Sequence, residues 1–212
     1  MRPLIAIAAA IAVTACSPGD GREAGAAETK TWPITDFTSL KAETGVRIIL
    51  QQGPYAVEAK SENGDLSRLS IEQRDFTLEV GSSGMFTVGR SPTYTVTLTA
   101  PEWTAIEASA GASVEGEGLK LAAFTIDASS GAGIDLSGEC ATLTASAAAG
   151  GSIEASDLRC VTVTADGLAG GSVHVFASET ATATATAGGS VEVSGNPANF
   201  TKTATAGGSV GP

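Results

Sequence analysis

The stretch Ala149-Gly-Gly-Ser-Ile153 decides the fold, because its pattern of small residues followed by Val or Ile recurs through the second half of the chain. The other copies are Gly111-Ala-Ser-Val114, Gly131-Ala-Gly-Ile134, Gly170-Gly-Ser-Val173, Gly188-Gly-Ser-Val191 and Gly207-Gly-Ser-Val210. Their final Val and Ile residues are spaced 20, 19, 20, 18 and 19 residues apart. Such a period is typical of units that bury a core only when they stack. The sequence therefore predicts a solenoid.

A second segment of each repeat alternates between apolar residues and threonine. The apolar members are Phe124 and Ile126, Leu143 and Ala145, Val163 and Ala165, Ala181 and Ala183, and Phe200, with Thr125, Thr144, Thr164, Thr182 and Thr201 between them. Successive residues of a strand point to opposite faces, so the apolar set faces a core. We expect two strands in each coil, with a glycine corner that adopts positive φ. Because no helical period follows residue 15, the fold class is all-β.

One residue breaks the inward apolar set. Lys202 stands where the other coils have Ala or Ile. Two interpretations remain: a local shift of register, or a charge that stops further strands from adding at the end of the sheet.

The N-terminal half has strand-like runs but lacks the repeated corner. These runs cover residues 46–50, 55–59, 69–71, 76–80 and 94–98, and turn residues separate them. Both Trp and both Tyr residues of the chain lie in this half. We expect a wider, irregular β region that continues into the solenoid and caps its first coil. Residues 31–212 then form a single domain.

The beginning of the chain carries an export signal. Residues 1–15 contain Arg2 followed by an apolar run that is too short to span a bilayer. Val13-Thr-Ala-Cys16 resembles a bacterial lipobox, which implies acylation at Cys16; ordinary cleavage that leaves a free thiol is the alternative. By the same resemblance, Ser17 after the cysteine favours the outer membrane. Residues 16–30 read as a flexible tether, so we expect a lipid-anchored protein of the bacterial cell envelope.

The charge balance limits the partners. The chain has 23 Asp and Glu against 12 Lys and Arg, a net charge of −11. This argues against nucleic acid as a partner, because its phosphates require basic residues.

Cys140 and Cys160 lie one repeat apart, so they should be neighbours on adjacent strands about 4.8 Å apart, within reach of a disulfide. A metal site on these thiols is not expected, because no histidine lies at ligand spacing, and no cofactor is expected.

The order of short motifs resembles a known family. Asp36-Phe37-Thr-Ser-Leu40, Gly45-Val-Arg-Ile48, Gln51-Gln-Gly53, Val57-Glu-Ala59, Leu66, Phe76-Thr-Leu78 and Val96-Thr-Leu98-Thr-Ala-Pro101 precede the Gly-x-Ser-Val units. This arrangement, over roughly residues 31–210, is similar to the putative auto-transporter adhesin head GIN domain family. The resemblance implies a right-handed parallel β-helix or β-solenoid in an exported bacterial protein, with no catalytic residues to carry over.

One outward position of each repeat forms a candidate binding stripe. Its members are Glu115, Asp135, Glu154, His174 and Glu192. Neighbouring carboxylates repel unless a cation lies between them, so the stripe is either a solvated face or a site for a divalent cation or cationic ligand. His174, the chain's one histidine, has no nucleophile or metal partner at a signature spacing.

Two further functions compete with binding. The threonine repeats are similar to the flat arrays of ice-binding β-solenoids, but their pairs do not all start at the same place, and Asp127 and Asp166 interrupt them. A carbohydrate-active β-helix enzyme would need a convergent polar cleft. We favour a non-enzymatic envelope lipoprotein whose rigid solenoid serves as a binding, adhesion or structural surface for a protein or glycan.

Overall fold

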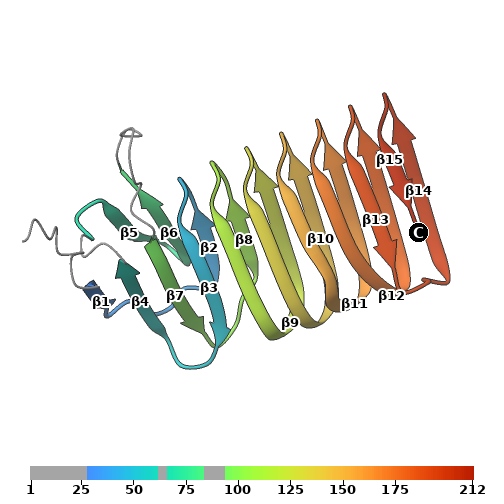
Figure 1. Ribbon diagram of the computed structural model, residues 1–212. Helices are drawn as coiled ribbons and strands as arrows, with labels where there is room; N and C mark the ends of the chain where they lie inside the picture. The colour runs from blue at the N-terminus through green and yellow to red at the C-terminus, as the bar shows by residue number, and fades with distance from the viewer. Residues whose placement is uncertain (1–27, 62–65, 84–93) are drawn as a thin grey trace, which may run out of the picture.

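The computed structural model describes residues 28–61, 66–83 and 94–212. All regular secondary structure in these ranges is β-strand. The N-terminal strands are β1 (Glu28–Trp32), β2 (Ser39–Ala42), β3 (Arg47–Gln52), β4 (Ala56–Ser61), β5 (Leu69–Arg74), β6 (Thr77–Ser82), β7 (Tyr94–Ala100) and β8 (Ala105–Ala108). They are followed by β9 (Ser113–Ser129), β10 (Gly133–Ala148), β11 (Ser152–Leu168), β12 (Ser172–Thr186), β13 (Ser190–Ser194), β14 (Asn199–Thr205) and β15 (Ser209–Gly211). Hydrogen bonds join all of them into one 15-stranded sheet (Figure 1). In the part of the chain described, no helix is available to cross a membrane.

The strands β9 to β12 are stacked coils of a parallel β-solenoid. Each is a long, bent strand that pairs in parallel with the coil before it and the coil after it. The register aligns Val114 with Ile134, Ile134 with Ile153, and Ile153 with Val173. The 19-residue period therefore predicts the stacking correctly, and the β-solenoid fold class is confirmed.

Each coil has three sides where the sequence predicts two strands. In β9, the exposed pairs Glu117-Gly118 and Ala122-Ala123 interrupt the alternation of buried and exposed residues. They separate a first side that ends at Gly116, a middle side around Lys120, and a third side from Phe124 onward. The middle side buries only Leu119 and Leu121. A run this short has no detectable alternation, which is why the sequence did not reveal it.

The N-terminal region continues two of these three sides. On the first side, β3 pairs with β9 in parallel, and β7, β4 and β1 extend the sheet beyond it. On the third side, β8 pairs with β9, and β2, β6 and β5 follow. The five predicted N-terminal strands are present, whereas β1, β2 and β8 were not predicted. Strand β1 begins at Glu28, inside the segment predicted as a tether.

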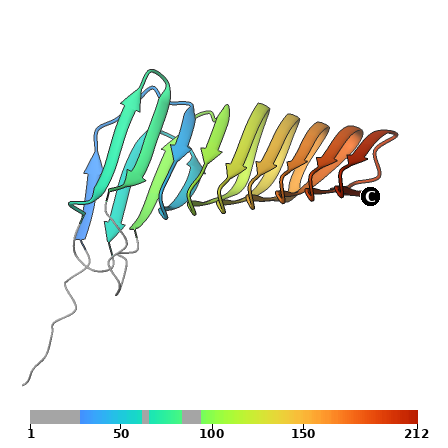
Figure 2. The ribbon, with the colours of Figure 1, turned by 90° about the horizontal axis from the view of Figure 1, so that it is seen from above.

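The core becomes narrower along the solenoid. The two largest fully buried side chains, Trp103 and Phe37, lie in the N-terminal region, and buried Leu and Ile residues continue as far as Leu158. From β12 onward the buried apolar residues are Val and Ala, among them Ala183. Figure 2 shows the corresponding taper from the wide N-terminal end to the narrow C-terminal tip. The inward residues of the repeats decrease in size in the same direction, from Phe124 and Ile126 to Ala181 and Ala183.

The corners between coils are tight turns with two residues at positive φ. In one of them, Ala169 and Gly170 have φ values of 48° and 79°, and the N–H of Gly171 donates to Leu168 O at 2.9 Å. This is the geometry of a type I′ turn. The pairs Thr44-Gly45, Ala110-Gly111, Ser130-Gly131, Ala149-Gly150, Ala187-Gly188 and Ala206-Gly207 also combine two positive φ values. The sequence predicted positive φ at the glycine but not at the residue before it.

The second glycine of the corner has a different role. A Cβ added at Gly171 would overlap the carbonyl oxygen of Ala147 in the preceding coil, whereas one added at Gly170 would meet open space. Gly171 therefore permits close contact between coils, and Gly170 permits the turn.

Two further predictions are settled by the register. Cys140 lies opposite Cys160 with 4.4 Å between their Cα atoms, and the two form the predicted disulfide on the middle side. Lys202 lies opposite Ala183 in an unbroken ladder between β12 and β14, which excludes the shift of register. The Lys202 side chain is exposed at the open end of the solenoid, with its Nζ 5.6 Å from the centre of the Phe200 ring. This position supports its interpretation as a charge that blocks the edge.

Candidate functional site

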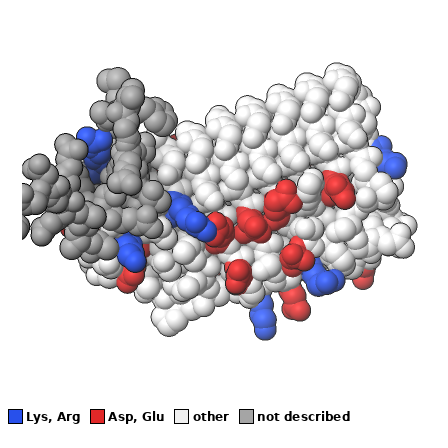
Figure 3. All heavy atoms as spheres, viewed as in Figure 1, with Lys and Arg blue, Asp and Glu red and all other residues white. Residues whose placement is uncertain are grey.

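A row of acidic residues runs across the first side of the coils. The register aligns Glu115 with Asp135, Asp135 with Glu154, Glu154 with His174, and His174 with Glu192. We call these five residues the acidic row; Figure 3 shows a line of red Asp and Glu side chains across the coils, interrupted by white. At its N-terminal end, Arg47 Nη2 lies 2.7 Å from Glu115 Oε2. The predicted stripe is thus a continuous surface feature, formed because equivalent positions of successive coils lie side by side.

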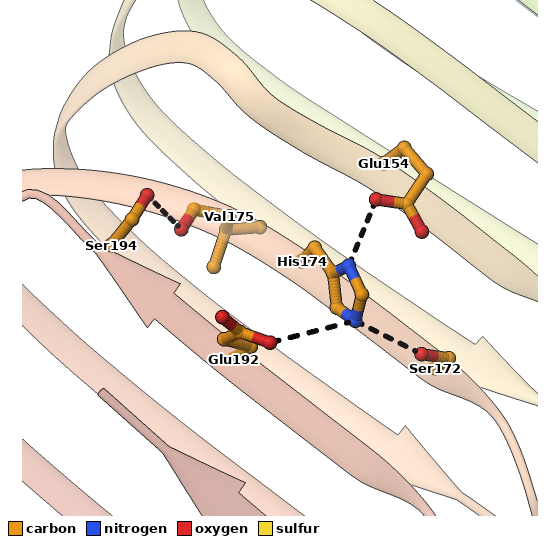
Figure 4. Close-up of polar contacts among 6 residues, drawn as sticks. All are labelled: Glu154, Ser172, His174, Val175, Glu192 and Ser194. Atoms are coloured by element: carbon orange, nitrogen blue, oxygen red, sulfur yellow. Dashed lines mark hydrogen bonds and ion pairs between the residues drawn. The ribbon is translucent and has the colours of Figure 1, made fainter.

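His174 connects two carboxylates of the acidic row. Its Nδ1 lies 2.9 Å from Glu154 Oε2 on β11, and its Nε2 lies 4.0 Å from Glu192 Oε2 on β13. Nε2 is also 3.5 Å from the hydroxyl oxygen of Ser172 (Figure 4). The side chains of His174 and Glu154 are 37% and 46% exposed, so the group is open to solvent.

Sequence reasoning placed the two glutamates beside His174 but missed Ser172. A residue two positions away on a strand lies on the same face, so the Ser172-Val-His174 spacing was an available signal.

The acidic row does not form a metal site in the structure. Among residues 28–61, 66–83 and 94–212, no three His, Cys, Asp or Glu side chains are placed to hold one metal ion. The straight row explains this, because ligands of one ion must converge on a point. The arrangement is better suited to a ligand that carries several positive groups.

Two shallow hollows lie outside the His174 group. One, of about 420 Å³, is lined by Ile49, Leu50, Gln51, Glu115, Gly116 and Glu117. It lies where β3 and β9 separate, and the Gln52 side chain spans the gap: its amide donates to Lys120 O at 2.9 Å and accepts from Lys120 N at 2.7 Å. The other, of about 170 Å³, is lined by Glu43, Ser70, Glu72, Arg74, Glu79, Val80 and Gly81. Carboxylates line both hollows: Glu115 and Glu117 in the first, and Glu43, Glu72 and Glu79 in the second.

The third side carries aligned rows of threonine. Thr142, Thr162 and Thr180 share one row, and the next row contains Thr125, Thr144, Thr164, Thr182 and Thr201. The pairs do start at different places, as expected: Thr142 and Thr162 begin theirs in the first row, whereas Thr182 begins its pair in the second row, and Thr180, which was not paired, occupies the first row. Asp127 and Asp166 lie in the adjacent row, on either side of Ser146. Partial burial raises the pKa of the Asp127 carboxyl, and a hydrogen bond with Ser146 acts in the opposite direction.

The proposed lipid attachment residue, Cys16, lies outside the described residues, as do the signal segment and most of the tether.

Comparison with known proteins places this geometry in a family. The family model for the putative auto-transporter adhesin, head GIN domain, matches residues 36–197. The match covers the N-terminal region from the turn before β2 and the solenoid as far as the turn after β13. No curated protein sequence matches the chain.

Solved structures of low sequence identity share the fold. A putative adhesin from Bacteroides fragilis is 19% identical with a TM-score of 0.69, over 87% of this chain and 96% of that one. A putative adhesin from Parabacteroides distasonis is 16% identical with a TM-score of 0.52, over 88% and 97% of the two chains. One from Parabacteroides merdae is 15% identical with a TM-score of 0.51, over 88% and 96%. At these identities the similarity establishes the fold alone.

Proposed function

Because the chain belongs to the family of putative auto-transporter adhesin head GIN domains, we propose that it is a non-enzymatic protein of the cell envelope that presents its solenoid as an adhesion surface. The observation that carries this proposal is the acidic row, which spans five successive coils on a rigid sheet. Its residues are held in register by backbone hydrogen bonds, so binding would order few flexible segments.

The ligand that fits the acidic row is a protein or glycan with several positive groups. The row repeats at the strand spacing, about 4.8 Å, and Arg47 is the one basic side chain that forms an ion pair with it among the described residues. Carboxylates packed this closely repel one another, and a multivalent cationic partner relieves that repulsion. Electrostatic attraction of this kind weakens as salt concentration rises.

Lipid anchoring at Cys16 would fix the orientation of this surface. The described chain begins at the wide end of the solenoid, and the C-terminus lies at the opposite, narrow tip (Figure 2). A protein attached to a membrane through its N-terminal tether would therefore direct the narrow tip away from the lipid. Two or more acyl chains are enough for stable attachment.

Neutralising the acidic row tests the binding proposal. The triple variant Asp135→Asn, Glu154→Gln, Glu192→Gln should lose retention on poly-lysine beads at low salt. The matched control Glu107→Gln, Asp127→Asn, Asp166→Asn removes the same charge from the third side and should retain binding. Equal loss in both variants would attribute retention to net charge and contradict a localised site.

The anchor has its own test. Expressed in a bacterium that processes lipoproteins, the wild-type chain should fractionate with membranes and incorporate a labelled fatty acid. Cys16→Ser should do neither. Membrane association that persists in Cys16→Ser would overturn the proposal of a lipid anchor.

The aligned threonine rows favour a second candidate surface. Their regular spacing, with two interrupting aspartates, is compatible with the ice-binding alternative. Inhibition of ice recrystallisation that is abolished by Thr164→Tyr and Thr182→Tyr would support it, and the absence of inhibition in the wild type would exclude it.

A further inference from the structure

Ser172, His174 and Glu154 have the connectivity of a hydrolytic triad (Figure 4). The order is Ser172 Oγ, His174 Nε2, His174 Nδ1 and Glu154 Oε2, with separations of 3.5 Å and 2.9 Å at its two ends. We propose that Ser172 is an activated nucleophile that takes up one acyl group from a carboxylic ester; this single acylation involves no turnover, so it is compatible with the non-enzymatic binding role above and independent of it.

The Glu154 contact determines which nitrogen of His174 acts as the base. An ionised carboxylate has no proton to donate, so the 2.9 Å contact requires Nδ1 to carry a hydrogen and donate it. In the neutral ring Nε2 then has a free lone pair. The Ser172 hydroxyl oxygen lies 3.5 Å from this nitrogen, which can take its proton as the contact shortens, and this is the arrangement that activates a serine.

Glu192 adds an electrostatic contribution from the opposite side. Its carboxylate lies 4.0 Å from Nε2, the nitrogen that receives the serine proton. A negative group at this position stabilises the imidazolium formed during the attack, and Glu154 does the same from Nδ1. Glu154 also fixes the orientation of the ring, so it is a positioning residue.

The arrangement occurs in one coil of the solenoid. Equivalent serines are found in other coils at Ser113, Ser152, Ser190 and Ser209, but the residues two positions after them are Glu115, Glu154, Glu192 and Gly211. Those serines occupy equivalent positions in the backbone ladder but have no histidine two residues later. They therefore serve as internal controls for acylation that depends only on the position of a serine in the fold.

The proposed reaction is an ordinary acyl transfer. Ser172 Oγ attacks the ester carbonyl carbon while its proton passes to His174 Nε2, and a tetrahedral intermediate forms. The ester C–O bond then breaks, and His174 returns the proton to the leaving alcohol, which gives acyl-Ser172 and the free alcohol. Because the group is open to solvent, it suits an ester with a small acyl group that is presented from outside.

The test uses the full chain and p-nitrophenyl acetate. We expect p-nitrophenol release with acetyl found by peptide mass spectrometry on Ser172 and not on Ser152 or Ser190. His174→Gln and Ser172→Ala should reduce acetylation at least about tenfold, whereas Ser190→Ala should match the wild type. Circular dichroism checks that each variant folds. Absence of acetylation, equal acetylation along the serine row, or unchanged acetylation in His174→Gln would overturn the proposal.

Glu154→Ala separates positioning from simple structural support. Loss of the Nδ1 partner should change the tautomer, which the ¹⁵N signals of the His174 ring report, and should lower the rate of acetylation; Glu154→Asp should partly restore both. A slower rate without any change of tautomer would contradict the role assigned to Glu154.

Discussion

The N-terminal region and the later coils are held together by different interactions. The described residues between 28 and 108 surround a wide core that contains Phe37 and Trp103, whose ring centres are 5.7 Å apart. The coils from β11 onward bury mainly Ala and Val and depend on continuous backbone ladders with close contact at glycine corners. Large side chains should therefore dominate stability at the wide end, and backbone geometry and crosslinks should dominate at the narrow end.

The largest expected loss of stability follows from truncating a large buried side chain at the wide end. Trp103 is 1% exposed, and its indole N–H donates to Gln51 O at 3.0 Å. Trp103→Ala should lower the free energy of unfolding by about 3–5 kcal/mol, measured by urea denaturation. Val173→Ala in the narrow core removes less buried surface and should cost about 2 kcal/mol or less. Equal costs would remove the proposed difference between the two regions.

Removing the disulfide should cause the next largest loss of stability, and this loss should be confined to the narrow end. Cys140→Ala with Cys160→Ala should cost about 3 kcal/mol, because the bond closes a loop of one repeat in the unfolded chain. The ladders on all three sides persist without it, so the melting temperature should fall while the β-sheet circular dichroism signal remains. Loss of that signal at room temperature would mean that the crosslink, and not the ladder, holds the coils.

The two corner glycines give a sharper comparison inside one turn. Gly171→Ala should cost about 2–3 kcal/mol, because its Cβ overlaps the backbone of the preceding coil. Gly170→Ala introduces only a positive-φ alanine and should cost about 1 kcal/mol. Hydrogen exchange should show the Gly171→Ala damage in β10 and β11 and not in β7. The reverse order of costs would contradict the close packing of coils.

The smallest expected effect depends on pH. The raised pKa of Asp127 means that the folded chain binds this proton more tightly than the unfolded chain does. The carboxylate therefore reduces stability at neutral pH, and the penalty disappears as the pH falls below the unfolded pKa of about 3.9. Because water screens this largely exposed carboxylate, Asp127→Asn should be more stable than wild type at pH 7 by no more than about 0.5 kcal/mol, and equally stable near pH 3. Thr184→Asn, in the same row, controls for the introduced Asn and should show no such pH dependence.

The sequence predicts the solenoid well because its period aligns equivalent residues, which is also why the Cys140–Cys160 pair and the acidic row could be located. It predicts less where no period exists. The polar strand β1 is an exposed edge without an apolar pattern, and the middle side is too short to show alternation. Ala169 gives no signal of positive φ, since alanine rarely adopts it. Ser172 was missed although its position two residues before His174 places it on the same face of the strand, whereas the contact of His174 with Glu154 joins two different coils.

The pairing of each coil with its immediate neighbours makes the length of the molecule adjustable. β11 pairs with β10 and β12, and neither end of the sheet takes part in those ladders. Duplicating or deleting one whole repeat would leave both ends unchanged and move the tip by one strand spacing, about 4.8 Å. Gain or loss of whole repeats can therefore change the length of the solenoid in fixed steps during evolution. Repeat number sets how far the tip reaches, independently of what any side chain binds.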